Sequence, residues 1–467
     1  MKKFLTLALA LCCVAAAAQN GSITPEMLSW ISGGWKGDAA DKALRNAIGQ
    51  TAINTLAVNA ENASMIDTGF SDRVKTVGIT DQKQSGRCWL FTGLNVLRAA
   101  AISKHSLGDF QFSQNYCFFW DQLEKSNLFL QAVIDTRDLP MDAREVDWLF
   151  EHPIGDGGTF TGIANLVCKY GLVPADVMPE TAVSNSTGQM SSHLRNLLRQ
   201  DGLKLRDMAQ QAAINAPRGG AKAKKAAAEL EANLQEAKTE MLSEVYHVLA
   251  LCLGVPPAEF EWKGKKTTPL EFYRELLGYD LEGGYVMLMN DPSREYGKVY
   301  EIQYDRHVYD GQNWLYVNLP VERIKEMAIA SIKADVAMYF SCDVGKFLDR
   351  KRGVADLRNY DYESLLGVSF TMDKRERILT HASGSSHVMT LIAVDLKEGV
   401  PQKWMVENSW GATSGYKGNI IMTDEWFDNY MFRLVVEKRF VPADVMQMLE
   451  QKPIMLPAWD PMYAAEE

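Results

Sequence analysis

A run of apolar residues that begins at a cysteine constrains the fold of this chain more than any other feature. After Cys88, apolar side chains recur at helical spacing: Leu90, Phe91, Leu94, Leu97 and Ala101. Ser85 and Gly86 precede the run where a helix usually places its N-terminal cap. We therefore predict a helix with Cys88 in its first turn, where the backbone N–H groups and the helix dipole favour a thiolate.

A single cysteine beside a tryptophan is most often a small buried hydrophobe, so this helix alone does not indicate catalysis. Two distant segments favour a reactive cysteine instead. His387 precedes an apolar run at residues 388–394 that predicts a strand, and Asn408 follows a second predicted strand, next to Trp410. A cysteine on a helix, a histidine on a strand and an asparagine beside a tryptophan are the components of a cysteine-peptidase triad.

In such a triad, each residue has a distinct role. Cys88 attacks the substrate carbonyl, His387 takes and returns the proton, and Asn408 accepts the other ring N–H and so fixes the tautomer. The amide of Gln82 could donate to the oxyanion together with the Cys88 backbone N–H. His381 competes with His387 for the role of base, but only His387 leads directly into the predicted strand.

The motifs around these residues are specific. Residues 86–89 read Gly-Arg-Cys-Trp, and residues 408–411 read Asn-Ser-Trp-Gly. With them, the chain resembles the papain-like cysteine peptidases, and more closely their bleomycin hydrolase and aminopeptidase C branch, which has Arg where papain-type enzymes have Ser. Further motifs that carry the resemblance lie at residues 112–120, 156–158, 169–171, 178–181, 342–345, 422–426 and 456–462.

The resemblance implies an α+β papain-like cysteine peptidase fold, with a helical half, a β-sheet half, a large mainly helical insertion and a C-terminal arm. Cys88 and His387 are roughly 300 residues apart, about twice the separation of about 130–150 residues in papain-type chains. The surplus predicts an insertion. We expect the following segments: a helical catalytic half at 68–172, the insertion with oligomer contacts at 173–320, a β-rich catalytic half at 321–451 and the arm at 452–467.

The N-terminus has the pattern of a targeting segment. Lys2 and Lys3 precede an apolar run at residues 4–15, and small residues follow up to Ala18. This predicts a signal peptide at residues 1–18, an exported protein that is periplasmic or secreted, and a leader segment at 19–67. The apolar run is too short to span a membrane.

Cysteine content and net charge argue against a disulfide-rich, a zinc-binding or a nucleic-acid-binding protein. Removal of residues 1–18 leaves an odd number of cysteines, whose spacing predicts neither a disulfide framework nor a zinc site. The sequence leaves open whether two of the cysteines other than Cys88 form one disulfide. The net charge of −10 argues against nucleic acid as the main partner. We expect no metal, no organic cofactor and no membrane association.

The resemblance also implies substrate contacts. Gly157 and Gly158 match the place where papain-like enzymes let the substrate backbone approach as a short strand. In the bleomycin hydrolase branch, the C-terminal arm enters the active-site cleft, and its carboxylate, here that of Glu467, meets the α-amino group of the substrate. Peptides with a free N-terminus are therefore the expected substrates, and a homohexamer is the expected assembly. Tyr463 departs from the family, which usually has Gly there.

Three alternatives stay open on the sequence. An endopeptidase or dipeptidyl peptidase would result if the altered arm did not block the cleft. A Cys-His acyltransferase would use the same triad. A non-enzymatic assembly or nucleic-acid-binding protein on an inherited fold is disfavoured by the acidic charge and by the intact candidate site residues.

Overall fold

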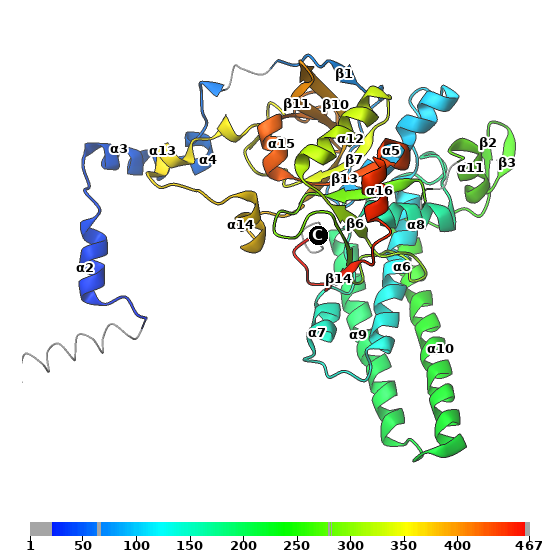
Figure 1. Ribbon diagram of the computed structural model, residues 1–467. Helices are drawn as coiled ribbons and strands as arrows, with labels where there is room; N and C mark the ends of the chain where they lie inside the picture. The colour runs from blue at the N-terminus through cyan, green and yellow to red at the C-terminus, as the bar shows by residue number, and fades with distance from the viewer. Residues whose placement is uncertain (1–20, 63–66, 279–280, 282, 463–467) are drawn as a thin grey trace, which may run out of the picture. The chain divides into compact units, whose positions relative to one another are not determined.

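The computed structural model describes residues 21–62, 67–278, 281 and 283–462 (Figure 1). Two predicted features, the signal peptide at 1–18 and the end of the arm with Glu467, lie outside these residues. The chain divides into two compact units, one formed by residues 1–63 and 360–370, the other by residues 64–359 and 371–467.

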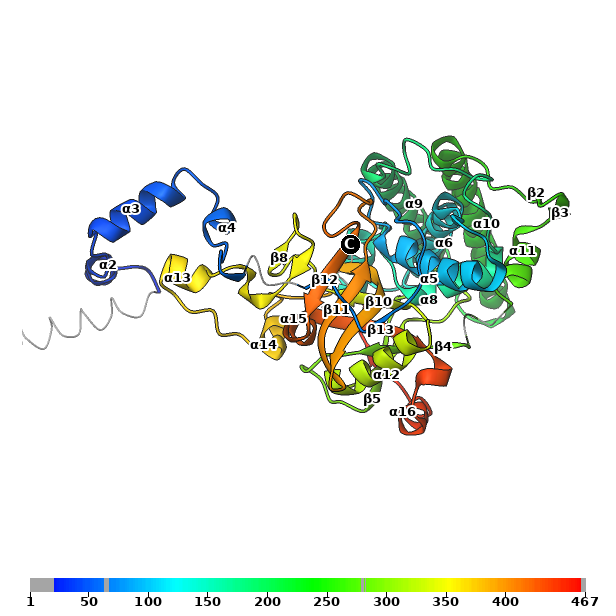
Figure 2. The same ribbon diagram turned by 90° about the horizontal axis from the view of Figure 1, so that it is seen from above.

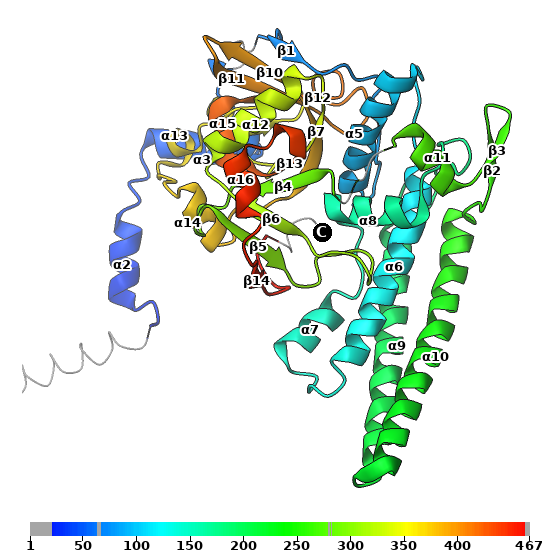
Figure 3. The same ribbon diagram turned by 45° about the vertical axis from the view of Figure 1, so that its right-hand side comes forward.

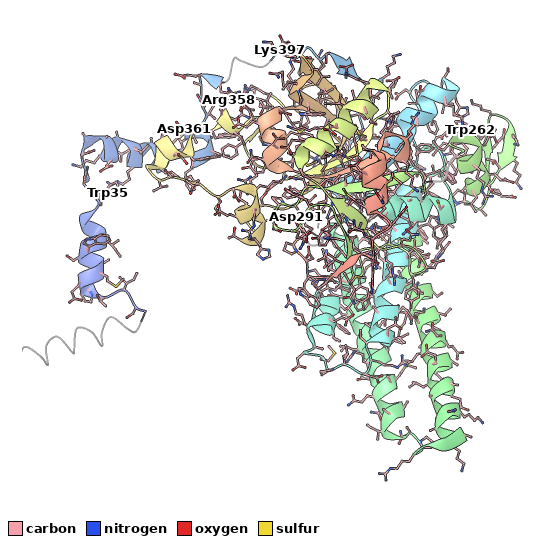
Figure 4. The ribbon with its side chains drawn as sticks, in the orientation of Figure 1. Trp35, Trp262, Asp291, Arg358, Asp361 and Lys397 are labelled. Carbon is pink, nitrogen blue, oxygen red and sulfur yellow. The ribbon has the colours of Figure 1, made fainter. Side chains whose placement is uncertain are left out.

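The first unit contains short helices: α2 (Pro25–Gly33), α3 (Ala39–Ile48), α4 (Ile53–Leu56) and α13 (Tyr362–Leu366). A capping box between Asp38 and Asp41 starts α3, because each side chain accepts from the other residue's backbone N–H. The backbone N–H of Asp361 donates to Ala57 O at 2.7 Å, which ties residues 360–370 to the N-terminal segment. Neither α2 nor α3 buries a residue, and Trp35 is 58% exposed (Figure 4).

A mixed sheet of twelve strands forms the middle of the second unit (Figure 2). Its strands, in spatial order, are β14 (Ile454–Leu456), β5 (Lys298–Ile302), β6 (Leu315–Asn318), β4 (Tyr285–Met289), β13 (Met431–Glu437), β7 (Met338–Cys342), β10 (His387–Lys397), β11 (Val400–Glu407), β12 (Asn419–Thr423), β9 (Val354–Ala355) and β8 (Leu348–Asp349), with β1 (Asp72–Arg73) on β10. Three of them, β4, β5 and β6, come from the segment predicted as a mainly helical insertion, so the end of that segment extends the sheet.

The central strands are apolar on both sides because helices cover both faces. Neighbouring residues of one strand contribute to different cores, as Val388 and Met389 of β10 do. One core includes α5 (Cys88–His105), α6 (Gln114–Asp135) and α8 (Phe160–Tyr170), and the other includes α12 (Val321–Lys333) and α15 (Asp424–Tyr430). The predicted helix at Cys88 therefore lies against one face of the sheet.

The remaining helices complete the second unit: α7 (Arg144–Glu151), α9 (Gly188–Ile214), α10 (Gly220–Leu253), α11 (Pro269–Leu276), α14 (Lys374–Leu379) and α16 (Ala443–Met448). The long helices α9 and α10 run side by side and pack against α6 (Figures 1 and 3). A hairpin of β2 (Phe260–Trp262) and β3 (Lys265–Thr267) lies between α10 and α11 in the chain. A capping box between Thr268 and Glu271 starts α11.

Candidate active site

Three elements bring the candidate catalytic residues into one region. Cys88 is the first residue of α5, His387 is the first residue of β10, and Asn408 directly follows β11. The strands β10 and β11 are antiparallel neighbours. The hydroxyl of Thr92, in the first turns of α5, donates to Val388 O at 3.0 Å, which fixes the start of this helix to the start of β10.

The hydrogen bond between His387 and Asn408 determines which imidazole nitrogen can act as a base. Asn408 Oδ1 lies 2.8 Å from His387 Nε2 and also accepts the backbone N–H of Ser409 at 2.8 Å. Because a backbone N–H can only donate, the amide atom that it meets is the oxygen. His387 Nε2 therefore carries the proton that it donates to Asn408, and Nδ1 keeps the lone pair that can accept a proton.

Trp410 covers this pair. Its indole stacks on the His387 imidazole with ring centroids 4.8 Å apart. The Arg350 guanidinium lies over the Trp410 ring, 5.0 Å from its centroid. Burial lowers the pKa of His387, the hydrogen bond to Asn408 opposes this effect, and the Arg350 charge adds to it, so that the pKa is about 4. The imidazole is therefore neutral at neutral pH and able to accept a proton.

The Gln82 side chain is fixed beside the same turn. Its Oε1 accepts from Ser409 Oγ at 2.6 Å, and its Nε2 donates to Ser85 O at 2.8 Å. Its backbone N–H donates to Ser409 O at 2.8 Å. The amide therefore has one orientation, with a second N–H on Nε2 that these bonds do not use.

The start of α5 differs from the prediction. The N-cap is Arg87, it makes no side-chain capping bond, and Ser85 and Gly86 lie outside the helix, so their predicted role as caps is wrong. Ser85 is occupied elsewhere, since its hydroxyl donates to Gln82 O and accepts from Arg87 Nε at 3.0 Å. The fully buried Arg87 also donates to the Glu180 carboxylate, from Nη1 at 3.1 Å and from Nη2 at 2.8 Å.

The predicted substrate segment lies close to the start of α5. Asp156, the residue before Gly157 and Gly158, accepts the Trp89 indole N–H with its backbone oxygen at 2.6 Å. Its carboxylate accepts the Gly86 backbone N–H at 3.3 Å. These bonds connect the segment to residues on both sides of Cys88. Glu467 lies outside the described residues.

Sequence reasoning missed a carboxylate that holds the loop before His387. The buried Asp343 accepts the hydroxyls of Ser383 at 2.7 Å and of Ser386 at 3.4 Å. No spacing rule relates Asp343 to these serines, because they meet only after β7 and β10 pair. His381, the alternative base, is exposed, as expected for a residue outside the site.

Within the described ranges, no group of three or more metal-ligating side chains lies close enough to bind an ion. None of the five cysteines in these ranges forms a disulfide, including the one that the sequence left open. No helix among the described residues is both long and apolar enough to cross a bilayer.

Comparison with known proteins identifies the family of this chain. A model of the Peptidase C1-like family matches residues 22–463. The chain is 39% identical to human bleomycin hydrolase over 83% of this chain and 86% of that protein. It is 36% identical to aminopeptidase G of Lactobacillus delbrueckii subsp. lactis, over 94% of this chain and 98% of the relative.

A solved structure supports the fold. PepW from Lactobacillus rhamnosis HN001 superposes with a TM-score of 0.87 at 34% identity, over 96% of this chain and all of that one. The predicted resemblance and the predicted α+β papain-like fold are therefore confirmed. This chain belongs to the Peptidase C1-like family and is a papain-like cysteine peptidase.

Proposed function

We propose that this protein is an exported cysteine aminopeptidase that removes N-terminal residues from peptides. The hydrogen bond between His387 Nε2 and Asn408 Oδ1 carries the proposal, because it leaves Nδ1 as the base. The position of Cys88 at the N-terminus of α5 supports its role as the nucleophile, since the positive end of the helix dipole stabilises a thiolate.

The reaction proceeds through a thioester. His387 Nδ1 takes the thiol proton while Cys88 Sγ attacks the carbonyl carbon of the first peptide bond. The oxyanion that forms accepts the free N–H of Gln82 Nε2 and a backbone N–H at the start of α5. The C–N bond breaks, the leaving amine takes the proton from His387, and the N-terminal residue stays bound as a thioester. Water, activated by His387, then attacks the thioester and releases the free amino acid and the Cys88 thiol.

The aminopeptidase specificity is supported by the relatives named aminopeptidase and by the anchoring of the C-terminal arm. Strand β14 of the arm pairs with β5, and the buried Asp460 forms an ion pair with Arg294, which also pairs with Asp291 at 2.9 Å. The buried Arg433 donates to Met462 O. In this proposal, the anchored arm delivers the carboxylate of Glu467 to the substrate α-amino group.

The test compares fluorogenic aminoacyl substrates with the same substrates blocked at the α-amine. Intact protein should cleave only the free-amine substrates, and protein that lacks residues 463–467 should also cleave the blocked ones. Equal cleavage of blocked substrates by the intact protein would instead identify an endopeptidase. Cys88→Ala, which should have no activity in either assay, shows that the measured hydrolysis comes from this site.

Export and assembly are further parts of the proposal. The composition of residues 1–18 supports a signal peptide, and mass spectrometry of the mature protein should find an N-terminus at Gln19. The family resemblance supports a homohexamer. Gel filtration coupled to light scattering should find six copies, and a monomeric mass would contradict this assembly.

A further inference from the structure

Three charged or ionisable side chains form a largely buried cluster beside Trp89, the residue after Cys88. Asp121 and Lys125 lie one turn apart on α6, and His307 follows β5. His307 Nδ1 lies 2.5 Å from Asp121 Oδ1, and Lys125 Nζ lies 3.0 Å from Asp121 Oδ2. Asp121 is fully buried and His307 is 3% exposed. We call these three residues the Asp–Lys–His cluster.

The charge states of the cluster follow from its surroundings. Burial favours the neutral acid, but Lys125 and His307 outweigh this effect and hold the pKa of Asp121 below its usual value. Burial and the neighbouring Lys125 lower the pKa of His307, so its imidazole is neutral. The neutral ring donates its Nδ1 proton to the carboxylate, and the carboxylate balances the lysine charge.

The cluster contacts the predicted substrate segment directly. Lys125 Nζ donates to Gly157 O at 2.5 Å and to Gly155 O at 3.1 Å. A Cβ atom on Gly158 would lie 2.2 Å from His307 Cε1, so the imidazole packs on the backbone of Gly158 itself. The ammonium group and the imidazole therefore hold adjacent residues of this segment.

The cluster also contacts the residue that follows the nucleophile. The Trp89 ring lies 4.6 Å from the His307 ring, centroid to centroid, and 5.3 Å from Lys125 Nζ. Its indole N–H holds Asp156 O, as described above. Trp89 thus connects the cluster to the first turn of α5 and to the residue before the glycine pair.

A pocket explains why polar anchors are needed there. Gly157 and Gly158 line a pocket together with Lys125, His307 and Tyr304. Close packing alone cannot fix a backbone that borders open space, whereas a charge-assisted hydrogen bond to a carbonyl can. A buried ammonium is costly unless a carboxylate balances it, and the carboxylate needs its own orienting donor. Lys125 provides the bond to the carbonyl, Asp121 balances the ammonium charge, and His307 orients the Asp121 carboxylate.

We propose that the Asp–Lys–His cluster is a positioning device that sets the distance between Cys88 and the substrate segment at Gly157 and Gly158. It touches no reacting atom, and it acts through the Gly157 carbonyl and the Trp89 ring. The inference rests on the proposed function only in taking these glycines as the surface against which the substrate residue binds.

Two alkylating reagents separate positioning from chemistry. Iodoacetamide needs only a reactive Cys88, whereas phenylalanyl chloromethyl ketone must also place its amino-acid residue against the glycine pair. The ratio of their second-order rates of Cys88 alkylation, followed by mass spectrometry, therefore reports the placement of the segment. Lys125→Met should lower the ratio of the ketone rate to the iodoacetamide rate by about tenfold, since a shift of about 1 Å costs that much or more.

Lys325→Met is the matched control. Lys125 and Lys325 are similarly buried, with side chains 14% and 10% exposed, and each pairs with aspartates. Lys325 pairs with Asp424 and Asp428 of α15, and neither aspartate belongs to the candidate site. Its substitution should lower the melting temperature but leave the ratio within about twofold of wild type.

His307→Gln is the second variant, for use if Lys125→Met does not fold. Glutamine can still donate to Asp121 but does not pack on Gly158 as a ring does, so the ratio of the ketone rate to the iodoacetamide rate should fall in this variant too. An unchanged ratio in the folded cluster variants, or an equal fall in Lys325→Met, would overturn the proposal. The aminopeptidase assignment fails separately, if wild-type protein cleaves no free-amine substrate while the alkylation ratio still responds to Lys125→Met.

Discussion

Arg98 of α5 and Glu407 of β11 form a buried ion pair, with Arg98 Nη2 2.9 Å from Glu407 Oε1 and both side chains at most 3% exposed. Glu407 directly precedes Asn408, and Arg98 lies on the helix that Cys88 begins. The pair therefore joins the element that carries the candidate nucleophile to the element that carries the orienting amide. Burial raises the pKa of Glu407 and lowers that of Arg98, as expected for charges withdrawn from water.

We predict that Arg98→Met destabilises the protein strongly. The variant leaves Glu407 as an uncompensated buried carboxylate, which should lower the free energy of unfolding by about 3–5 kcal/mol. Urea unfolding followed by tryptophan fluorescence measures the change. Lys225→Met breaks an exposed pair with Glu229 and should change stability by less than about 1 kcal/mol. Similar losses in both variants would show that burial does not determine the value of the Arg98 pair.

The proposed roles of Cys88, His387 and Asn408 predict a graded loss of activity. Cys88→Ala should abolish turnover without unfolding the protein. His387→Ala should lower kcat by about 10³-fold or more, because it removes the proposed general base. Asn408→Ala should cost only about 10–100-fold, since it removes an orienting partner. Steady-state kinetics on one aminoacyl substrate gives the three values, and equal losses for His387→Ala and Asn408→Ala would contradict the orienting role.

The pH dependence should follow the imidazole. In the proposed mechanism, neutral His387 is the base, and its pKa of about 4 means that kcat/KM should fall only as the pH drops through that value. Arg350→Gln removes a positive charge that lowers this pKa, so the acid limb should move to higher pH, most clearly at low ionic strength. Arg350→Lys keeps the charge and should leave the profile in place. A shift in the opposite direction would exclude this electrostatic effect.

Asp343 should matter for activity more than for folding. Asp343→Ala removes the acceptor of the Ser383 and Ser386 hydroxyls in the loop before His387, and it should lower kcat by about tenfold through misplacement of the imidazole. Asp343→Asn keeps one carbonyl acceptor and should recover part of kcat. If the alanine and asparagine variants have the same kcat, the hydrogen bonds do not position the base.

The close approach of α5 and α8 can be tested at Gly93. A Cβ atom there would lie 1.9 Å from Ile163 Cδ1, so Gly93→Ala should reduce stability by about 1–3 kcal/mol through overpacking. Ile163→Val removes the clashing methyl group and should cost about 0.5–1.5 kcal/mol by itself. The double variant should lose less than the sum of the two, because each change relieves the other. Thermal unfolding of the three variants measures the coupling, and additive losses would refute the contact.

The sequence alone was sufficient for the family and the fold class, because both depend on local patterns. The helix at Cys88 follows from the spacing of its apolar residues. The strand after His387 and the strand before Asn408 follow from apolar runs that are bounded by these polar residues. The same patterns identified Cys88, His387, Asn408 and Gln82 as candidates. Their order in the chain and their motifs required no knowledge of the contacts between them.

The tertiary structure decided what these local patterns do not contain. Arg98 and Glu407 are 309 positions apart, and Asp121 and His307 are 186 positions apart. No periodicity relates such pairs, because β-sheet pairing and helix packing bring them together only after the chain has folded. The cap of α5 shows the same effect: Ser85 has the right residue type, but Gln82 and Arg87 occupy its hydroxyl. A buried charge selects its partner by burial and geometry, and only the folded chain determines both.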